Sequence, residues 1–140
     1  MFSNPVHPEP VEGPTFAGAY LFMAFQRRHP EEPSDATGFV DRGNRYGRNG
    51  VYGRAIEDFT KALELDPEHA EAYYDRGCSW YEVGKYDDAI ADLTRAIELN
   101  PNADHYYGQR AMVYLFDDQP ELSQADQDRR EELRVRAQEG

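Results

Sequence analysis

Residues 72–101 read AYYDRGCSWYEVGKYDDAIADLTRAIELNP, and this stretch decides the fold because residues 38–67 already carry the same pattern. Aligning the two stretches superposes identical residues: Asp41-Arg42-Gly43 on Asp75-Arg76-Gly77, Gly50 on Gly84, Ala55-Ile56 on Ala89-Ile90, Asp58 on Asp92, and Pro67 on Pro101. The two stretches are offset by 34 residues. A period of this length is typical of stacked helical repeats, so the sequence predicts a tandem array.

Each unit reads as helix, turn, helix. In its second half the apolar residues recur at helical spacing, namely Ala55, Phe59, Ala62 and Leu63, then Ala89, Leu93, Ala96 and Ile97. A glycine, Gly50 or Gly84, interrupts the chain before these helices, and a proline, Pro67 or Pro101, lies just beyond them. Helices of about 12 to 14 residues are marginal alone in water, so the units are expected to stack on one another.

A third unit begins in the same register, because Tyr107 and Arg110 follow Tyr73 and Arg76 by the length of one repeat. Residues 117–120 then replace the glycine turn, and the spacing of Ala89 and Asp92 returns at Ala125 and Asp128 after an insertion of two residues. We therefore predict two full repeats and a degenerate third, with boundaries at 37–69, 70–103 and 104–138. The last helix, about 120–138, carries little apolar surface and is predicted to form a polar C-terminal cap.

The repeat resembles the tetratricopeptide repeat, a helix pair with small residues where its helices cross, aromatic residues opposite them and a closing proline. In one unit the resemblance rests on Phe39, Gly43, Tyr46, Gly50, Tyr52, Ala55, Phe59, Ala62 and Pro67. In the next unit it rests on Tyr73, Gly77, Trp80, Gly84, Tyr86, Ala89, Leu93, Ala96 and Pro101. The resemblance implies an all-α, right-handed superhelical solenoid over residues 37–138. It also implies a concave groove that holds an extended or helical segment of another protein.

By the geometry of that family, the first helix of each unit lines the groove. It would present Val40, Asp41, Asn44 and Arg48, then Glu71, Tyr74, Asp75, Cys78 and Tyr81, then His105, Gln109, Met112 and Phe116. The candidate peptide-binding residues among them are Asn44, Arg48, Tyr74, Asp75, Cys78, Tyr81, Gln109 and Met112. Tyrosine and methionine supply adaptable contact area, so the expected ligand is a partly apolar protein segment or peptide with basic character. Packing between repeats is the alternative role for each of these side chains.

Some members of this family hold the C-terminal carboxylate of heat-shock chaperones with lysines, an arginine and asparagines. The matching positions here carry Val40, Asn44, Asp75, His105 and Gln109. Only Asn44 fits that pattern, and Asp75 would repel a carboxylate. We do not expect this activity.

An arginine stands in each repeat, at positions 42, 76 and 110, where the family often has an aliphatic residue. A partly buried arginine is strongly destabilising without a carboxylate partner. Asp58 and Asp92 recur in the second helices of the same units, so we predict the pairs Arg42 with Asp58 and Arg76 with Asp92.

The composition limits the classes of partner that the chain is expected to bind. A net charge of −12 disfavours nucleic acid and anionic lipid surfaces. The longest mostly apolar stretch, residues 16–25, is about half of what a membrane helix needs, so no membrane insertion is expected. The order of charges around it argues against a signal peptide. A single cysteine allows a reducing compartment, and we expect the cytoplasm.

Residues 1–36 hold six of the nine prolines and are predicted to be a mostly irregular tail. Residues 15–28 could form one short helix that docks on the repeats, or could stay without structure between the proline clusters.

No pattern for catalysis, cofactor or metal is present. The spaced glycines Gly47, Gly50 and Gly53 lack the strand and the Gly-Lys-Ser/Thr end of a phosphate loop. The four histidines lack metal-ligand spacing, and Cys78 has no base near it in the sequence. We therefore expect no enzyme, no cofactor and no metal. The alternative to peptide binding is a small solenoid that forms a homo-oligomer through its open end or through residues 16–25.

Overall fold

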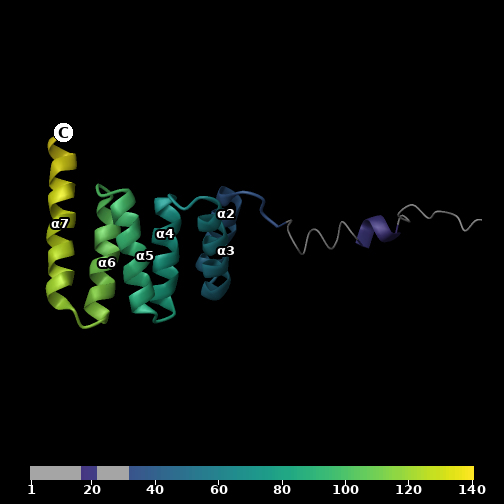
Figure 1. Ribbon diagram of the computed structural model, residues 1–140, viewed down its shortest axis with the longest axis horizontal. Coiled ribbons are helices and arrows are strands. Elements are labelled where there is room, and N and C mark those ends of the chain that lie inside the picture. Colours follow the sequence, from purple (N-terminus) through teal and green to yellow (C-terminus); the bar gives the residue numbers. More distant parts are fainter. Residues whose placement is uncertain (1–16, 22–31) are drawn as a thin grey trace, which may run out of the picture. The chain divides into compact units, whose positions relative to one another are not determined.

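The computed structural model describes residues 17–21 and 32–140. In these ranges the chain has helices and no strands, as predicted for an all-α protein. The six long helices are α2 (Ala36–Arg48), α3 (Tyr52–Leu65), α4 (Ala70–Glu82), α5 (Tyr86–Leu99), α6 (Asp104–Phe116) and α7 (Pro120–Glu139). They stand side by side, with α2 and α3 at one end of the stack and α7 at the other (Figure 1).

The helices keep the period of the sequence through the whole array. The first helices begin at residues 36, 70 and 104, and the second helices at residues 52, 86 and 120. Each first helix packs on the second helix of its own pair, and α3 and α5 also pack on the first helix of the next pair. Residues 36–139 therefore form three stacked helix pairs, and the predicted two-residue insertion in the third pair is wrong.

The turn inside the third pair explains this error. Gly50 and Gly84 adopt positive φ angles of 74° and 77°, which a glycine accepts without a steric penalty. Asp118 occupies the position of Gly84 in the next repeat and adopts the same left-handed conformation, with a φ of 56°. Aspartate is one of the few side chains that visit this region. The turn is thus retained although its glycine is missing.

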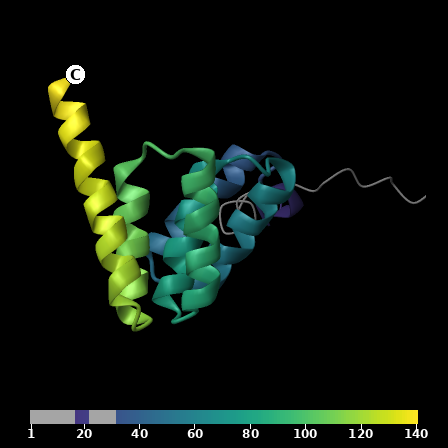
Figure 2. The same ribbon diagram turned by 60° about the vertical axis from the view of Figure 1, so that its left-hand side comes forward.

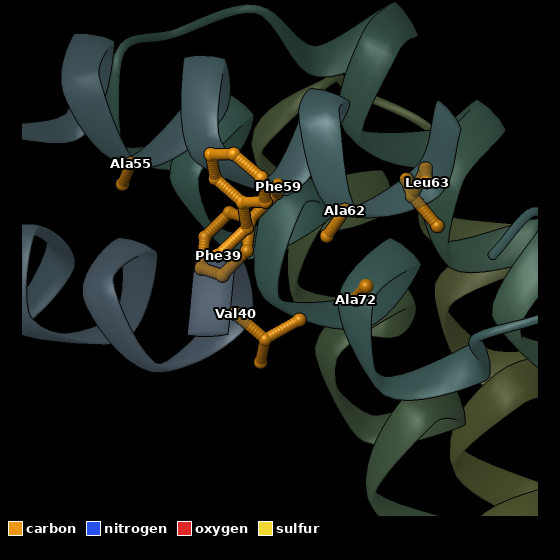
Figure 3. Close-up of a cluster of buried hydrophobic side chains, with 7 residues drawn as sticks. All are labelled: Phe39, Val40, Ala55, Phe59, Ala62, Leu63 and Ala72. Atoms are coloured by element: carbon orange, nitrogen blue, oxygen red, sulfur yellow. The ribbon is translucent and has the colours of Figure 1, made fainter. Parts of the chain in front are cut away.

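The core is built from the predicted apolar positions. Phe59 and Leu63 pack with Phe39, Val40 and three alanines, Ala55, Ala62 and Ala72, in one buried cluster (Figure 3). Ala89, Leu93, Ala96 and Ile97 are buried in the same way in the second pair. The helical stripe read from both repeats is confirmed.

Small residues are required where the two helices of a pair cross. A Cβ atom on Gly43 would lie 2.8 Å from the ring of Phe59, and one on Gly77 would lie 2.9 Å from Cγ of Leu93. Both distances are shorter than a van der Waals contact. The glycines therefore allow a close approach of the helices that a larger residue would prevent.

An arginine and an aspartate join the two helices of every pair. Arg42 Nε donates to Asp58 Oδ2 over 2.7 Å, and Arg76 Nε donates to Asp92 Oδ2 over the same distance. A second bond of 2.8 Å from Nη2 to Oδ1 makes each contact bidentate. These two predicted pairs are confirmed.

The arginines also connect neighbouring pairs. Arg76 Nη1 donates to Thr60 Oγ1 of the preceding unit over 3.1 Å, and Arg110 Nη1 donates to Thr94 Oγ1 over 3.0 Å. One guanidinium thus bonds to its own repeat and to the one before. The same arginine therefore stabilises both the packing of the two helices within a pair and the stacking of that pair on the preceding one.

Helix α7 ends the stack with a polar surface. The positions that carry Ile90, Leu93 and Ile97 in α5 carry the exposed Gln124, Gln127 and Glu131 in α7. The helix has 20 residues against the 14 of α5, and it extends past α6 (Figure 2). Its polar character agrees with the predicted cap.

Residues 17–21 form one helical turn, which belongs to a separate unit from residues 33–140. The remainder of the predicted 15–28 helix lies outside the described residues. Within those residues, no helix has both the length and the apolar character that crossing a membrane requires.

Candidate binding groove

A pocket of about 270 Å³ lies between α2 and α4. It contains four of the eight predicted site residues, two from each helix: Asn44 and Arg48, then Asp75 and Cys78. Asn44 and Arg48 are one turn apart on α2, and Asp75 and Cys78 are one turn apart on α4, so each pair faces the same side of its helix. The period of the repeat therefore brings these residues together.

Further residues line the pocket that are not among those predicted for it from the sequence. The remaining lining consists of Gly47, Tyr52, Phe59, Ser79 and Glu82. Tyr52 is the first residue of α3, and Phe59 belongs to the predicted apolar stripe that forms the core. The family pattern points only to first helices, so a contribution from α3 gives no signal in it.

Asp75 is the charged centre of this pocket. Its carboxylate is partly buried and accepts a hydrogen bond from the side chain of Asn44. Burial raises the pKa of Asp75 to about 6; the bond from Asn44 opposes this rise, nearby Glu71 adds to it, and His69 and His105 oppose it. The carboxylate is thus ionised at neutral pH at a cost in solvation.

Cys78 is a thiol and not a thiolate. Burial raises its pKa to about 12, while a hydrogen bond with the side chain of Tyr74 acts in the opposite direction. A nucleophilic cysteine needs a lowered pKa. Cys78 consequently acts as a small lining and packing residue.

Tyr74 belongs to an aromatic cluster between α4 and α6. Its ring stacks on Tyr106 at 5.1 Å and meets His105 edge to face at 5.0 Å between ring centroids. The hydroxyl of Tyr106 donates to Glu71 Oε2 over 2.7 Å, and His105 Nε2 lies 3.8 Å from the same oxygen. This predicted site residue therefore packs between repeats, outside the lining of the pocket.

Tyr81 and Met112 also lie outside the lining of this pocket. Tyr81 contacts Phe116 edge to face at 5.6 Å. Met112 is 46% exposed and, with Gly108, Ala111 and Leu115, forms the α6 side of a second hollow of about 500 Å³ against α7. Gln109 is partly buried on α6 and lines neither hollow.

Val40 does not line the groove. Only 8% of it is exposed, and it packs in the core with Phe39 and Leu63. Its predicted place in the groove is wrong, because this apolar side chain is buried in a cluster with residues of α3 and with Ala72 of α4.

The model of the tetratricopeptide repeat family matches residues 40–104 and 74–115, which together span more than half of the chain. The chain belongs to the tetratricopeptide repeat family. No curated protein sequence matches it.

Solved structures of tetratricopeptide repeat domains resemble the chain closely. The first such domain of Spaghetti (RPAP3), bound to the HSP90 peptide SRMEEVD, is 25% identical with a TM-score of 0.69; the match covers 73% of this chain and 81% of that one. The second domain of human RPAP3, in complex with the HSP70 peptide SGPTIEEVD, is 28% identical with a TM-score of 0.68, covering 70% and 82%. MamA shares the fold at 19% identity and a TM-score of 0.74, covering 76% of this chain and 63% of MamA.

Proposed function

We propose that the chain is a protein-interaction module and not an enzyme, and that the groove formed by α2, α4 and α6 binds an extended segment of another protein. Residues 37–138 would form the binding domain and residues 1–36 a tail. The observation that carries the proposal is the pocket between α2 and α4, where Asn44, Arg48, Asp75 and Cys78 meet. Related tetratricopeptide repeat domains hold peptides, which supports this use of the fold.

The charge of the groove favours a segment with basic character. Asp75 and Glu82 line the pocket, Glu71 lies beside it, and the chain carries a net charge of −12. The peptides bound by the two RPAP3 domains end in Glu-Glu-Val-Asp and are acidic. A carboxylate placed beside Asp75 would be repelled in a site of reduced dielectric constant. The ligand class thus differs from that of these neighbours.

Two glycine substitutions give a matched test of the groove. Gly47 lines the pocket and Gly53 does not, and a Cβ atom at either would meet nothing within 4 Å. A tryptophan at position 47 would fill the pocket, while one at position 53 adds the same group outside it. We would select peptides from a phage-displayed library of random dodecapeptides on the full chain at pH 7.5.

The selected peptides are expected to bind the Gly53→Trp variant as they bind the natural chain. They should lose at least tenfold in affinity for the Gly47→Trp variant in a fluorescence polarisation titration. Equal binding by both tryptophan variants, or no enrichment over an unrelated protein, would contradict the proposal.

Exposed apolar side chains on α6 favour a second candidate, self-association of the chain through this helix. Met112, Leu115 and Phe116 are 46%, 58% and 59% exposed. A homodimer would bury them, although the net charge of −12 on each copy opposes association. Light scattering after size exclusion, over a hundredfold range of concentration, separates the candidates. A protein that stays monomeric at every concentration supports binding of a segment in the groove. A dimer that Phe116→Ser abolishes supports self-association.

A further inference from the structure

We infer that the pocket between α2 and α4 receives one lysine or arginine side chain of the bound segment, with the Asp75 carboxylate as its counter-ion. This inference rests on the proposed function, because it names the side chain that the groove selects.

Asp75 differs from the three buried aspartates of the stacked helices. Asp58, Asp92 and Asp126 are each bonded in bidentate fashion to an arginine. Asp75 makes no ion pair of 4.0 Å or less with any residue that the structure describes, and its bonded neighbour is the neutral amide of Asn44. This carboxylate is thus removed from water without a cation to compensate.

The charge of the pocket lining matches a single cation. Asp75 and Glu82 contribute two carboxylates, and Arg48 contributes one guanidinium. The lining therefore carries a net charge of −1 at neutral pH. One ammonium or guanidinium group neutralises it, and Arg48 would repel a second.

The size and walls of the pocket fit one long side chain. Pockets for drug-sized ligands measure about 300 to 1,000 Å³, and this one has about 270 Å³. Tyr52 and Cys78 provide apolar surface for the alkyl stem of a lysine or arginine, while the charged end reaches the carboxylate.

Protonation of Asp75 should control this contact. The titratable, charged or hydrogen-bonding groups around it are Asn44 and Arg48 on α2, Tyr52 on α3, Glu71, Tyr74, Cys78 and Glu82 on α4, His69 before α4, and His105 and Tyr106 on α6. Burial raises the pKa of Asp75 to about 6. A group with this pKa is mostly neutral at pH 5 and mostly ionised at pH 7.5, so binding of a cation should be about tenfold weaker at pH 5.

The test uses the full chain and the dodecapeptides selected at pH 7.5, resynthesised as matched pairs with lysine or with uncharged norleucine at the enriched position. The protein variants are Asp75→Asn, which keeps the shape and the bond to Asn44, and Glu64→Gln, which removes an exposed carboxylate outside the pocket. Circular dichroism confirms that each variant is folded.

We expect lysine or arginine at one fixed position of the selected peptides. Replacing that lysine by norleucine should cost at least tenfold in affinity for the natural chain and for Glu64→Gln, and less than twofold for Asp75→Asn. The tenfold change between pH 5 and 7.5 should also be lost in Asp75→Asn.

Selected peptides without a fixed cation, or an equal loss on norleucine replacement in Asp75→Asn, would overturn the inference. If those peptides are still blocked by Gly47→Trp, the groove binds and only the role of Asp75 is wrong. If Gly47→Trp has no effect on them, the proposed function itself fails.

Discussion

Arg110 and Asp126 are joined by two hydrogen bonds of 2.7 Å, from Nε to Oδ2 and from Nη2 to Oδ1. They are 16 residues apart, the same spacing as Arg42 and Asp58 in the first pair and Arg76 and Asp92 in the second. This contact shows that the third helix pair is built as the other two are, although its sequence has diverged.

Removing the carboxylate of this pair should destabilise the fold strongly. Asp126 is 5% exposed, so Asp126→Ala leaves the Arg110 guanidinium largely buried without a carboxylate partner. We expect a loss of about 2 to 4 kcal/mol in the free energy of unfolding, measured by urea denaturation. As a control, Glu132→Ala breaks an exposed pair with Arg129 and should cost less than about 0.5 kcal/mol. Equal losses in the two variants would show that the buried pair is dispensable.

The turn at Asp118 can be improved. This residue has a φ of 56°, where a side chain costs about 1 kcal/mol relative to glycine. Asp118→Gly should therefore raise the free energy of unfolding by up to about 1 kcal/mol. Gly84→Ala, the reverse change at the equivalent turn, should lower it by a similar amount. Thermal unfolding of both variants measures the two shifts, and shifts of the same sign would contradict the shared turn geometry.

Glycine has opposite roles at two positions of the first helices. At Gly77 an added methyl group would lie 2.9 Å from Cγ of Leu93, whereas at Gly47 it would meet nothing within 4 Å. Gly77→Ala should cost about 1 to 3 kcal/mol by forcing α4 and α5 apart. Gly47→Ala should stabilise α2 by about 0.5 to 1 kcal/mol, because alanine loses less conformational entropy in a helix. Chemical denaturation distinguishes the two, and a stabilising Gly77→Ala would refute the close helix crossing.

The free protein should lose stability as Asp75 ionises. Burial raises its pKa from the ordinary value of 3.8 to about 6, so between pH 4 and 6 the folded state binds more protons than the unfolded state. The contribution of Asp75 to the free energy of unfolding therefore falls as the pH rises through this window. The free energy of unfolding of Asp75→Asn should exceed that of the natural chain by about 1 to 2 kcal/mol at pH 7.5 and should match it at pH 4. Urea denaturation at both pH values checks this. A difference between the two proteins that is larger at pH 4 than at pH 7.5 would contradict the predicted direction of the pH dependence.

Much of the fold could be predicted because its causes are local and periodic. The stripes around Phe59 and Leu93 follow from helical spacing, and the pairs Arg42 with Asp58 and Arg76 with Asp92 follow from the need of a buried arginine for a carboxylate. The insertion predicted in the third repeat is wrong because no glycine marks its turn. Asp118 takes the left-handed conformation in place of glycine, and the partner of Arg110 is Asp126 and not a residue displaced by two positions.

The candidate site could be predicted only in part. Asn44, Arg48, Asp75 and Cys78 come together because repeat geometry places them on facing sides of α2 and α4. Tyr74 instead packs on Tyr106, which follows from the aromatic residues that α6 happens to carry. Within the described part of the chain, Asp75 makes no ion pair, and this depends on distances between helices, which no sequence pattern encodes.

The sequence by itself determined the length of the repeat, the helix pair as the unit and the residues that each helix buries, because these follow from spacing along the chain. Only the tertiary structure decided that the third pair is complete, that an arginine bonds to two neighbouring repeats and that Asp75 lies partly buried with no ion pair among the residues that the structure describes. Those features depend on the packing of segments far apart in sequence, where the distance between side chains sets the strength of each electrostatic contact.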